Sequence, residues 1–256
     1  MTRITDLIND ENRRWWTLGA MCLALFMVML DNTVVNVALP SIQRDLDTSI
    51  SGLEWIVNGY TLSFAVLLAV GGRLGDIFGR RRMFIFGVIV FTLASTTAGF
   101  APDNFSLVAS RVLQGVGAAF MMPGTLSIIT NAFPPAERGK AIGTWAGVSA
   151  LALAIGPVLG GFLTEQVSWR AIFFINLPVG VVAVAAALLF VKESRDYTVG
   201  RDVDVLDRLH LGPQRPTQPL QLGQPFFDPL RQHGTRSADP RHGGRVPAGD
   251  SRRQDV

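Results

Sequence analysis

The sequence predicts an all-α integral membrane protein with six transmembrane helices, followed by a polar tail. Of its 256 residues, 48% are apolar and only 17% are charged, whereas a soluble domain usually carries about 25% charged residues. The charges are sparse before residue 191 and dense after it. Six apolar runs precede that point, each long enough to cross the hydrocarbon layer, which takes roughly twenty helical residues. We therefore expect a multi-pass helical bundle with a separate tail.

The six predicted spans follow one another with short connections. They lie at residues 15–39, 53–71, 83–100, 105–130, 141–164 and 171–191. Each must be a helix, because backbone groups in lipid need partners within the segment and no alternating barrel pattern is present. The first run has no small-residue cleavage pattern near its end and five further runs follow it, so we interpret it as a membrane span rather than a signal peptide.

Lysine and arginine residues are divided unequally between the two sets of loops. Eleven lie in the N-terminal segment, the second and fourth loops and the segment after the last span, whereas only Arg44 and Arg170 lie on the opposite side. Cytoplasmic loops carry the excess of basic residues, so residues 1–14 and the segment from residue 192 are predicted to be cytoplasmic. The net charge of +3 therefore indicates membrane topology, and a nucleic-acid partner is not expected.

Residues 192–256 are predicted to form a disordered cytoplasmic tail. From residue 200 onward the chain holds all three histidines, seven of the fourteen prolines and nine arginines, and it has no hydrophobic period. Such a composition cannot bury a core. The tail is either a natural sequence or the product of a frameshift or truncation in a GC-rich gene, and we favour the second interpretation.

Two spans contain polar residues that are costly in hydrocarbon. Asp31 is expected in the outer half of the first span, followed by a polar stripe of Asn32 and Asn36. Arg111 lies about six residues inside the outer end of the fourth span, and Gln114 is one turn further along the same face. Intramembrane charges face a partner or a watery cavity. We hypothesise an Asp31–Arg111 ion pair that opens when Asp31 takes a proton or a cationic substrate; alternatively, both charges reach the outer surface by snorkelling.

The segment from Gly72 to Arg82 connects spans two and three. It combines glycines, a single acid and four arginines, which predicts a tight turn at the cytoplasmic surface. Simple positive-inside anchoring explains the arginines but not Asp76. Because Arg80 lies four residues further on, Asp76 can accept a hydrogen bond from it, as a latch would require.

The fifth span is rich in glycine. Two pairs, Gly143 with Gly147 and Gly156 with Gly160, have the four-residue spacing that lets helix backbones approach closely. Pro157 removes a backbone donor and should bend the helix. The pattern suits either a helix that rocks or a static packing groove.

An enzyme, a metal site and a bound cofactor are not expected. The spans and loops contain no phosphate-binding glycine–lysine loop and no His/Cys set with metal-ligand spacing, and no histidine precedes residue 210. A transporter built this way would take its energy from an ion gradient rather than from ATP on this chain.

Together these segments resemble the major facilitator superfamily, specifically the drug:proton antiporters of its fourteen-span QacA/EmrB-type branch. The resemblance covers about residues 10–195 and rests on five motifs in order. They are Leu30–Pro40, Gly72–Arg82, Arg111–Ala119, Ala154–Gly161 and Trp169–Pro178. It implies that the six spans form the N-terminal bundle of a major-facilitator fold in the cell membrane.

The resemblance also implies proton-coupled export of drug-like, cationic or amphipathic compounds. The residues implied in proton or substrate coupling are Asp31, Asn32, Asn36, Arg111 and Gln114. Those implied in a cytoplasmic gate are Gly72, Asp76, Gly79, Arg80 and Arg81. Those implied in the antiporter motif, which would bend span five and limit leak, are Gly156, Pro157, Gly160 and Gly161.

The expected partners are the lipid bilayer, a small-molecule substrate and a second helical bundle. Alternating access in this family rocks two halves around a midplane site, and this sequence supplies six spans only. A second six- or eight-span half, or a second chain, is therefore expected. Two alternatives remain: a porter of the same fold for a non-drug solute, and an assembly subunit or inactive fragment that transports nothing.

Overall fold

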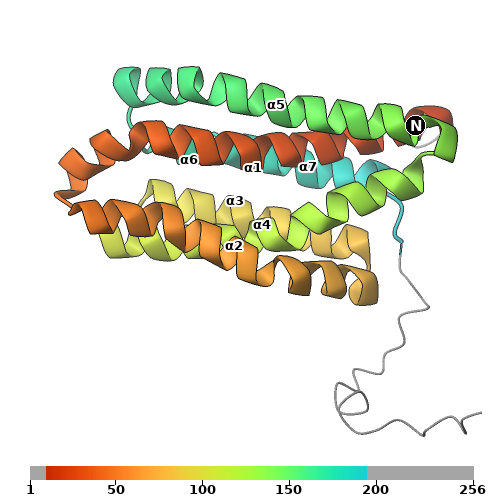
Figure 1. Cartoon of the computed structure of the whole chain (residues 1–256), viewed down its shortest axis with the longest axis horizontal. Coiled ribbons are helices and arrows are strands. Elements are labelled where there is room, and N and C mark those ends of the chain that lie inside the picture. Colours follow the sequence, from red (N-terminus) through yellow and green to blue (C-terminus); the bar gives the residue numbers. More distant parts are fainter. Residues whose placement is uncertain (1–9, 195–256) are drawn as a thin grey trace, which may run out of the picture. The chain divides into compact units, whose positions relative to one another are not determined.

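The computed structural model describes residues 10–194, and every regular element in this part of the chain is an α-helix (Figure 1). The helices are α1 (Asp10–Leu46), α2 (Ile50–Phe78), α3 (Arg80–Gly99), α4 (Asn104–Ala132), α5 (Pro135–Gln166), α6 (Ala171–Phe174) and α7 (Asn176–Phe190). Six helical segments are long and apolar enough to cross a membrane, α6 and α7 together making the sixth. The predicted fold class is confirmed. The predicted disordered tail lies outside the described residues.

The helices extend beyond the apolar runs that predicted them. The first helix, for example, reaches Leu46 rather than residue 39, because polar residues at the membrane surface continue the helix without interrupting its hydrogen bonds. Asp31 lies just past the midpoint of α1, and its place in the outer half of the span stays a prediction.

The connection between spans two and three is shorter than predicted. Helix α2 continues to Phe78 and α3 begins at Arg80, so only Gly79 is non-helical. Its φ of +110° is open to glycine and strained for other residues. The predicted turn from Gly72 to Arg82 is therefore two helix ends joined at one glycine.

The sixth span runs from Ala171 to Phe190, close to the predicted span over residues 171–191. One turn residue, Ile175, separates α6, which ends at Phe174, from α7, which begins at Asn176, and its backbone stays in the αR region. Pro178 lies in the first turn of α7 and has no amide to donate to the carbonyl of Phe174, so the helical ladder lacks one hydrogen bond here. Asn176, at this point of the span, is a residue of the polar site described below.

Short loops are held by helix caps. Ser49 accepts a hydrogen bond from the amide of Gly52 at 3.2 Å and begins α2. Asp103 accepts from the amide of Ser106 at 2.8 Å and begins α4. The amide and hydroxyl of Ser106 together hold the pKa of the Asp103 carboxyl below its usual range. These caps satisfy amides that a helix start leaves without partners.

The helix contacts show an internal symmetry between two three-helix units, one made of α1, α2 and α3 and the other of α4, α5 and α7. Helix α1 packs mainly against α5 and α7, and α4 packs mainly against α2 and α3, while α1 meets α4 and α3 meets α7 (Figure 1). Exchanging α1 with α4, α2 with α5, and α3 with α7 leaves this pattern unchanged. Because three crossings separate equivalent helices, the two units have inverted topology, as transporter repeats commonly do.

Candidate functional site

The buried core is divided by a layer of polar side chains. One apolar cluster contains residues 18–28 of α1 and 118–133 of α4, and the other contains residues 30–42 of α1 and Leu107 of α4. Seven buried polar residues lie along the chain between members of the two clusters, and hydrogen bonds join five of them. These five are Asp31, Ser95, Arg111, Gln114 and Asn176. Four helices, α1, α3, α4 and α7, thus each contribute to one polar layer inside the bundle.

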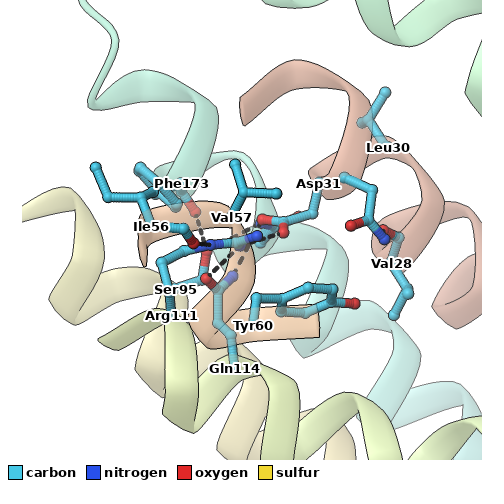
Figure 2. A network of polar contacts seen from close by, with 12 residues as sticks. Val28, Leu30, Asp31, Ile56, Val57, Tyr60, Ser95, Arg111, Gln114 and Phe173 are labelled. Atoms are coloured by element: carbon cyan, nitrogen blue, oxygen red, sulfur yellow. Dashed lines mark hydrogen bonds and ion pairs between the residues drawn. The ribbon is translucent and has the colours of Figure 1, made fainter. Parts of the chain in front are cut away.

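Asp31 and Arg111 form an ion pair at the centre of this layer (Figure 2). The Nη1 group of Arg111 donates to Oδ2 of Asp31 at 2.5 Å, and the two side chains are 2% and 0% exposed, respectively. The structure therefore brings together the two charges that the sequence hypothesis paired, and neither reaches the surface of the bundle. The snorkelling alternative does not describe this arrangement.

The carboxylate of Asp31 is held by two further donors. Its Oδ1 atom accepts from Nε2 of Gln114 and from Nδ2 of Asn176, both at 3.1 Å. Asn176 also donates to the hydroxyl of Ser95, which in turn donates to the carbonyl of Phe173. Both oxygens of the Asp31 carboxylate are thus engaged by side chains of α4 and α7.

Arg111 has neutral partners in addition to Asp31. Its Nη1 group donates to Oε1 of Gln114 at 2.8 Å, and its Nε group donates to the carbonyl of Ile56 at 3.3 Å. The guanidinium also lies 4.4 Å from the ring centre of Tyr60 (Figure 2). Arg111 thus keeps a carbonyl, an amide and an aromatic face around it if Asp31 becomes neutral.

The two asparagines predicted for the same site lie elsewhere on α1. Asn36 is exposed and Asn32 is half-buried, and each amide donates to the helix backbone, at Asn32 and Val28 respectively. They do not join the Asp31–Arg111 network. The predicted coupling set is therefore divided into a buried trio, a half-buried Asn32 and an exposed Asn36.

The sequence reasoning missed Asn176, Ser95 and Tyr60. Asn176 is the only strongly polar residue in the apolar run 171–191, and an isolated polar residue in a span is costly unless partnered. That signal was available. Ser95 stands among other hydroxyl residues of α3, so nothing in the sequence singles it out.

The predicted cytoplasmic gate motif forms the junction of α2 and α3. Asp76 accepts from Nε and Nη2 of Arg80 at 3.1 and 2.9 Å, the i,i+4 pair expected from the sequence. Gly72 lies against Pro123 of α4. The guanidinium of Arg81 donates to the carbonyls of Ala187 and Leu188 at the end of α7. The motif therefore binds two neighbouring helices.

Glu193 is a further member of this junction that the sequence did not indicate. Its carboxylate accepts from the amide of Arg81 at 3.1 Å and lies 3.7 Å from Nε of Arg82. A Cβ atom at Gly79 would lie 2.5 Å from the same carboxylate. The absence of a side chain at Gly79 thus allows the segment after α7 to dock on the junction.

Replacing Gly79 by alanine is expected to lower the free energy of unfolding by about 1–3 kcal/mol, because alanine is strained at this φ and its methyl group meets Glu193. Gly75→Ala is the matched control, since a Cβ there meets nothing within 4 Å and alanine favours a helix. Thermal unfolding in detergent measures both. Equal effects at the two positions would contradict the assignment of Gly79 as a conformationally required glycine.

The antiporter motif places two glycines at the contact between α1 and α5. A Cβ at Gly156 would lie 1.7 Å from Oγ1 of Thr33, and one at Gly160 would lie 3.0 Å from Cα of Val34. The close approach predicted for this pair is confirmed. A Cβ atom added at Gly161, at Gly143 or at Gly147 would meet nothing within 4 Å. Within the described bundle, the prediction of close packing is therefore wrong for the pair Gly143 and Gly147. These three glycines do not contribute to contacts in the described bundle.

Helix α5 continues through Pro157 as one element, and the bend predicted there stays a prediction. Within residues 10–194, no group of three or more potential metal-ligating His, Cys, Asp or Glu side chains lies together.

The chain matches the protein-family model described as Major Facilitator Superfamily over residues 21–229. It is 42% identical over 195 residues to the tetracenomycin C resistance and export protein of Streptomyces glaucescens, covering 76% of this chain and 36% of that protein. It is 46% identical over 186 residues to a puromycin resistance protein of Streptomyces alboniger, covering 72% of this chain and 37% of that protein. The chain thus spans about a third of the length of these relatives.

Among solved structures, a crystal structure of a peptide transporter in complex with sulfate matches with a TM-score of 0.61 and 14% identity. The match covers 67% of this chain and 37% of that one. At this identity the likeness concerns the fold alone. The family model covers most of the chain. The helices of this chain are arranged like those of the solved transporter. The chain is a multi-pass membrane protein that belongs to the major facilitator superfamily.

Proposed function

We propose that this chain provides the N-terminal bundle of a proton-coupled exporter of drug-like, cationic or amphipathic compounds in the cytoplasmic membrane. The observation that carries the proposal is the buried ion pair between Asp31 and Arg111, in a family member whose relatives are resistance and export proteins. Charged residues inside a membrane bundle are costly and commonly mark ion or substrate pathways. The resemblance of five motifs to the fourteen-span branch supports a place for the chain in that branch.

In this proposal Asp31 carries the proton. As an anion it is held by Arg111, Gln114 and Asn176. Protonation removes its attraction for the guanidinium, and Arg111 then relies on Gln114, the carbonyl of Ile56 and the ring of Tyr60. The polar layer therefore has two arrangements, and a cationic substrate that replaces Arg111 beside Asp31 would compete with the proton.

The other predicted residues have supporting roles in the proposal. Asn32 and Asn36, on the accessible side of α1, contact the substrate. The cytoplasmic gate consists of Gly72, Asp76, Gly79, Arg80 and Arg81. The excess of arginine in the neighbouring loops is the reason for assigning this gate to the cytoplasmic side. Gly156, Pro157, Gly160 and Gly161 bend α5 and limit leak.

We further infer that the chain works with a second bundle, on a second chain or in a longer protein. Only 17% of the most apolar window of α2, and the same share of α5, is buried in the described bundle. These two faces remain for lipid or for another bundle. Alternating access also needs two halves that move around a central site.

Proton flux in proteoliposomes tests the proposal. Adding ethidium to liposomes that contain the chain together with its second bundle should move protons, as an internal pH-sensitive dye reports, and Asp31→Asn should abolish this flux. Asp45→Asn is the control, because Asp45 is an exposed acid paired with Arg170 away from the polar layer. Proton flux that is equal in Asp31→Asn and in the unsubstituted chain would overturn the role of Asp31. A folded chain without any flux would favour the non-transporting subunit.

A further inference from the structure

A second polar feature lies far from Asp31, where α1 begins and α4 and α7 end. It is a cavity of about 400 Å³. Three basic side chains, Arg13, Arg14 and Lys192, line it together with a single acid, Glu193. Arg14 precedes Asp31 by about 25 Å along the helix, so the cavity is separate from the proposed coupling site.

The acid in the cavity wall already has cationic and amide partners outside it. Glu193 accepts from the amide of Arg81 and pairs with Arg82 at the α2–α3 junction. Arg14 in turn pairs with Glu137 at 3.2 Å. The three basic side chains that line the cavity still outnumber its one acid, which favours an anion as the ligand.

Two buried polar atoms in the cavity wall have no hydrogen-bond partner among the described residues. They are Nε of Arg14 and Oγ of Ser194. The Nη1 group of Arg14 pairs with Glu137 at 3.2 Å, which leaves the Nε–H group of the same guanidinium as an unused donor. Buried donors are rarely left unpaired. A ligand with several acceptor oxygens would satisfy both atoms at once.

Aromatic side chains place the cavity at the depth of lipid head groups. Trp16 stacks on Phe190, a residue of the cavity wall, with ring centres 5.3 Å apart, and Trp15 packs edge-on against Phe133. Both tryptophans are exposed on the bundle. Tryptophan is enriched where the membrane meets water, so the cavity lies at one interface. The apolar part of its wall, Ile128 and Ala132, suits the first methylene groups of the acyl chains of a lipid.

We propose that this cavity binds the phosphate group of an anionic phospholipid such as phosphatidylglycerol. An arginine presents a planar set of donors that matches phosphate oxygens, and basic pockets between membrane helices on the cytoplasmic side bind anionic head groups. The bound phosphate would link the start of α1 to the end of α7. The proposal does not depend on transport by this chain.

Native mass spectrometry of the full chain in detergent, titrated with phosphatidylglycerol or with phosphatidylcholine, tests this assignment. One molecule of phosphatidylglycerol should be retained in preference to phosphatidylcholine. Arg14→Gln should weaken retention about tenfold, as expected for loss of a charge-assisted hydrogen bond. The matched control is Arg138→Gln, which removes the same charge from the start of α5, outside the cavity.

Ser194→Ala is the second variant, because it removes a hydroxyl without breaking a hydrogen bond described in the structure. It should weaken retention about threefold and decides the matter if Arg14→Gln does not fold. Equal losses in Arg14→Gln and Arg138→Gln would overturn the site in favour of diffuse attraction. If Arg14→Gln does not fold, unchanged retention of phosphatidylglycerol by Ser194→Ala would also overturn the site. A third titration uses inorganic phosphate. If phosphate binds in a way that depends on Arg14 while phosphatidylglycerol is not selectively retained, the ligand of the cavity is a soluble phosphate and the lipid assignment is overturned.

Discussion

Replacing Asp31 by alanine is expected to lower the free energy of unfolding by about 3–5 kcal/mol, the cost of leaving a buried charge without its partner. Arg111 would remain inside the bundle with only neutral groups around it, since its side chain is 2% exposed. Arg111→Ala should be similarly destabilising. Unfolding of the purified chain by denaturant in mixed micelles measures both variants.

A double variant separates the ion pair from the size of its side chains. Asp31→Leu combined with Arg111→Met removes both charges and should be more stable than Asp31→Leu or Arg111→Met alone, because no unpaired charge remains. The Arg170–Asp45 pair is the control, with side chains 35% and 47% exposed. Arg170→Gln should cost no more than about 1 kcal/mol. A double variant no more stable than the worse single variant would contradict the energetic pairing of Asp31 and Arg111.

Replacing Gly156 by alanine is expected to destabilise the bundle by about 1–3 kcal/mol, the usual effect of overpacking. The new methyl group would lie 1.7 Å from Oγ1 and 2.5 Å from Cβ of Thr33. Because Thr33 is itself held by a hydrogen bond to the carbonyl of Leu30 at 2.8 Å, the two helices would have to move apart. Thermal unfolding in detergent measures the change.

Gly161 provides the matched control in the same helix and the same motif. A Cβ at Gly161 meets nothing within 4 Å, so Gly161→Ala should raise stability by up to about 1 kcal/mol through helix propensity. Opposite signs at the two glycines are the expected result. Destabilisation of equal size at Gly161 would indicate that helix–helix contact is not what requires Gly156.

The fold was predictable because span length and charge asymmetry follow from the bilayer itself. About twenty apolar residues must form a helix in lipid, and that rule found all six spans. The helices extend beyond the span ends that this rule predicted, because polar residues at the membrane surface continue a helix.

The charged residues at the centre of the site were predictable because a charge inside an apolar span costs free energy and therefore needs a partner. Asp31 and Arg111 stand out in apolar spans, and opposite charges at similar depth favour pairing. The side to which a neutral residue turns was not predictable. Asn32 and Asn36 adjoin Asp31 in sequence yet lie outside its network, whereas Asn176, which is 145 residues away from Asp31, donates to it. Only the packing of α7 against α1 and α3 makes that contact.

In the proposed function, the polar layer is the part of a largely apolar bundle that takes up two arrangements. Apolar clusters on either side of it are closely packed and resist gradual deformation. The layer itself offers Arg111 alternative partners at similar distances. A change of charge at Asp31 would therefore be expected to alter the contact of α1 with α4 and α7.

The most direct test of this account is an infrared titration of Asp31 in membranes that contain the chain. Difference spectra across pH, with Asp31→Asn subtracted, isolate the carboxyl band of this one residue. The account predicts that a protonated carboxyl band appears as pH falls while the bundle stays folded, and that adding a lipophilic cation removes it. An Asp31 that stays ionised at every pH at which the chain is folded, with or without the cation, would contradict the assignment of Asp31 as the proton carrier.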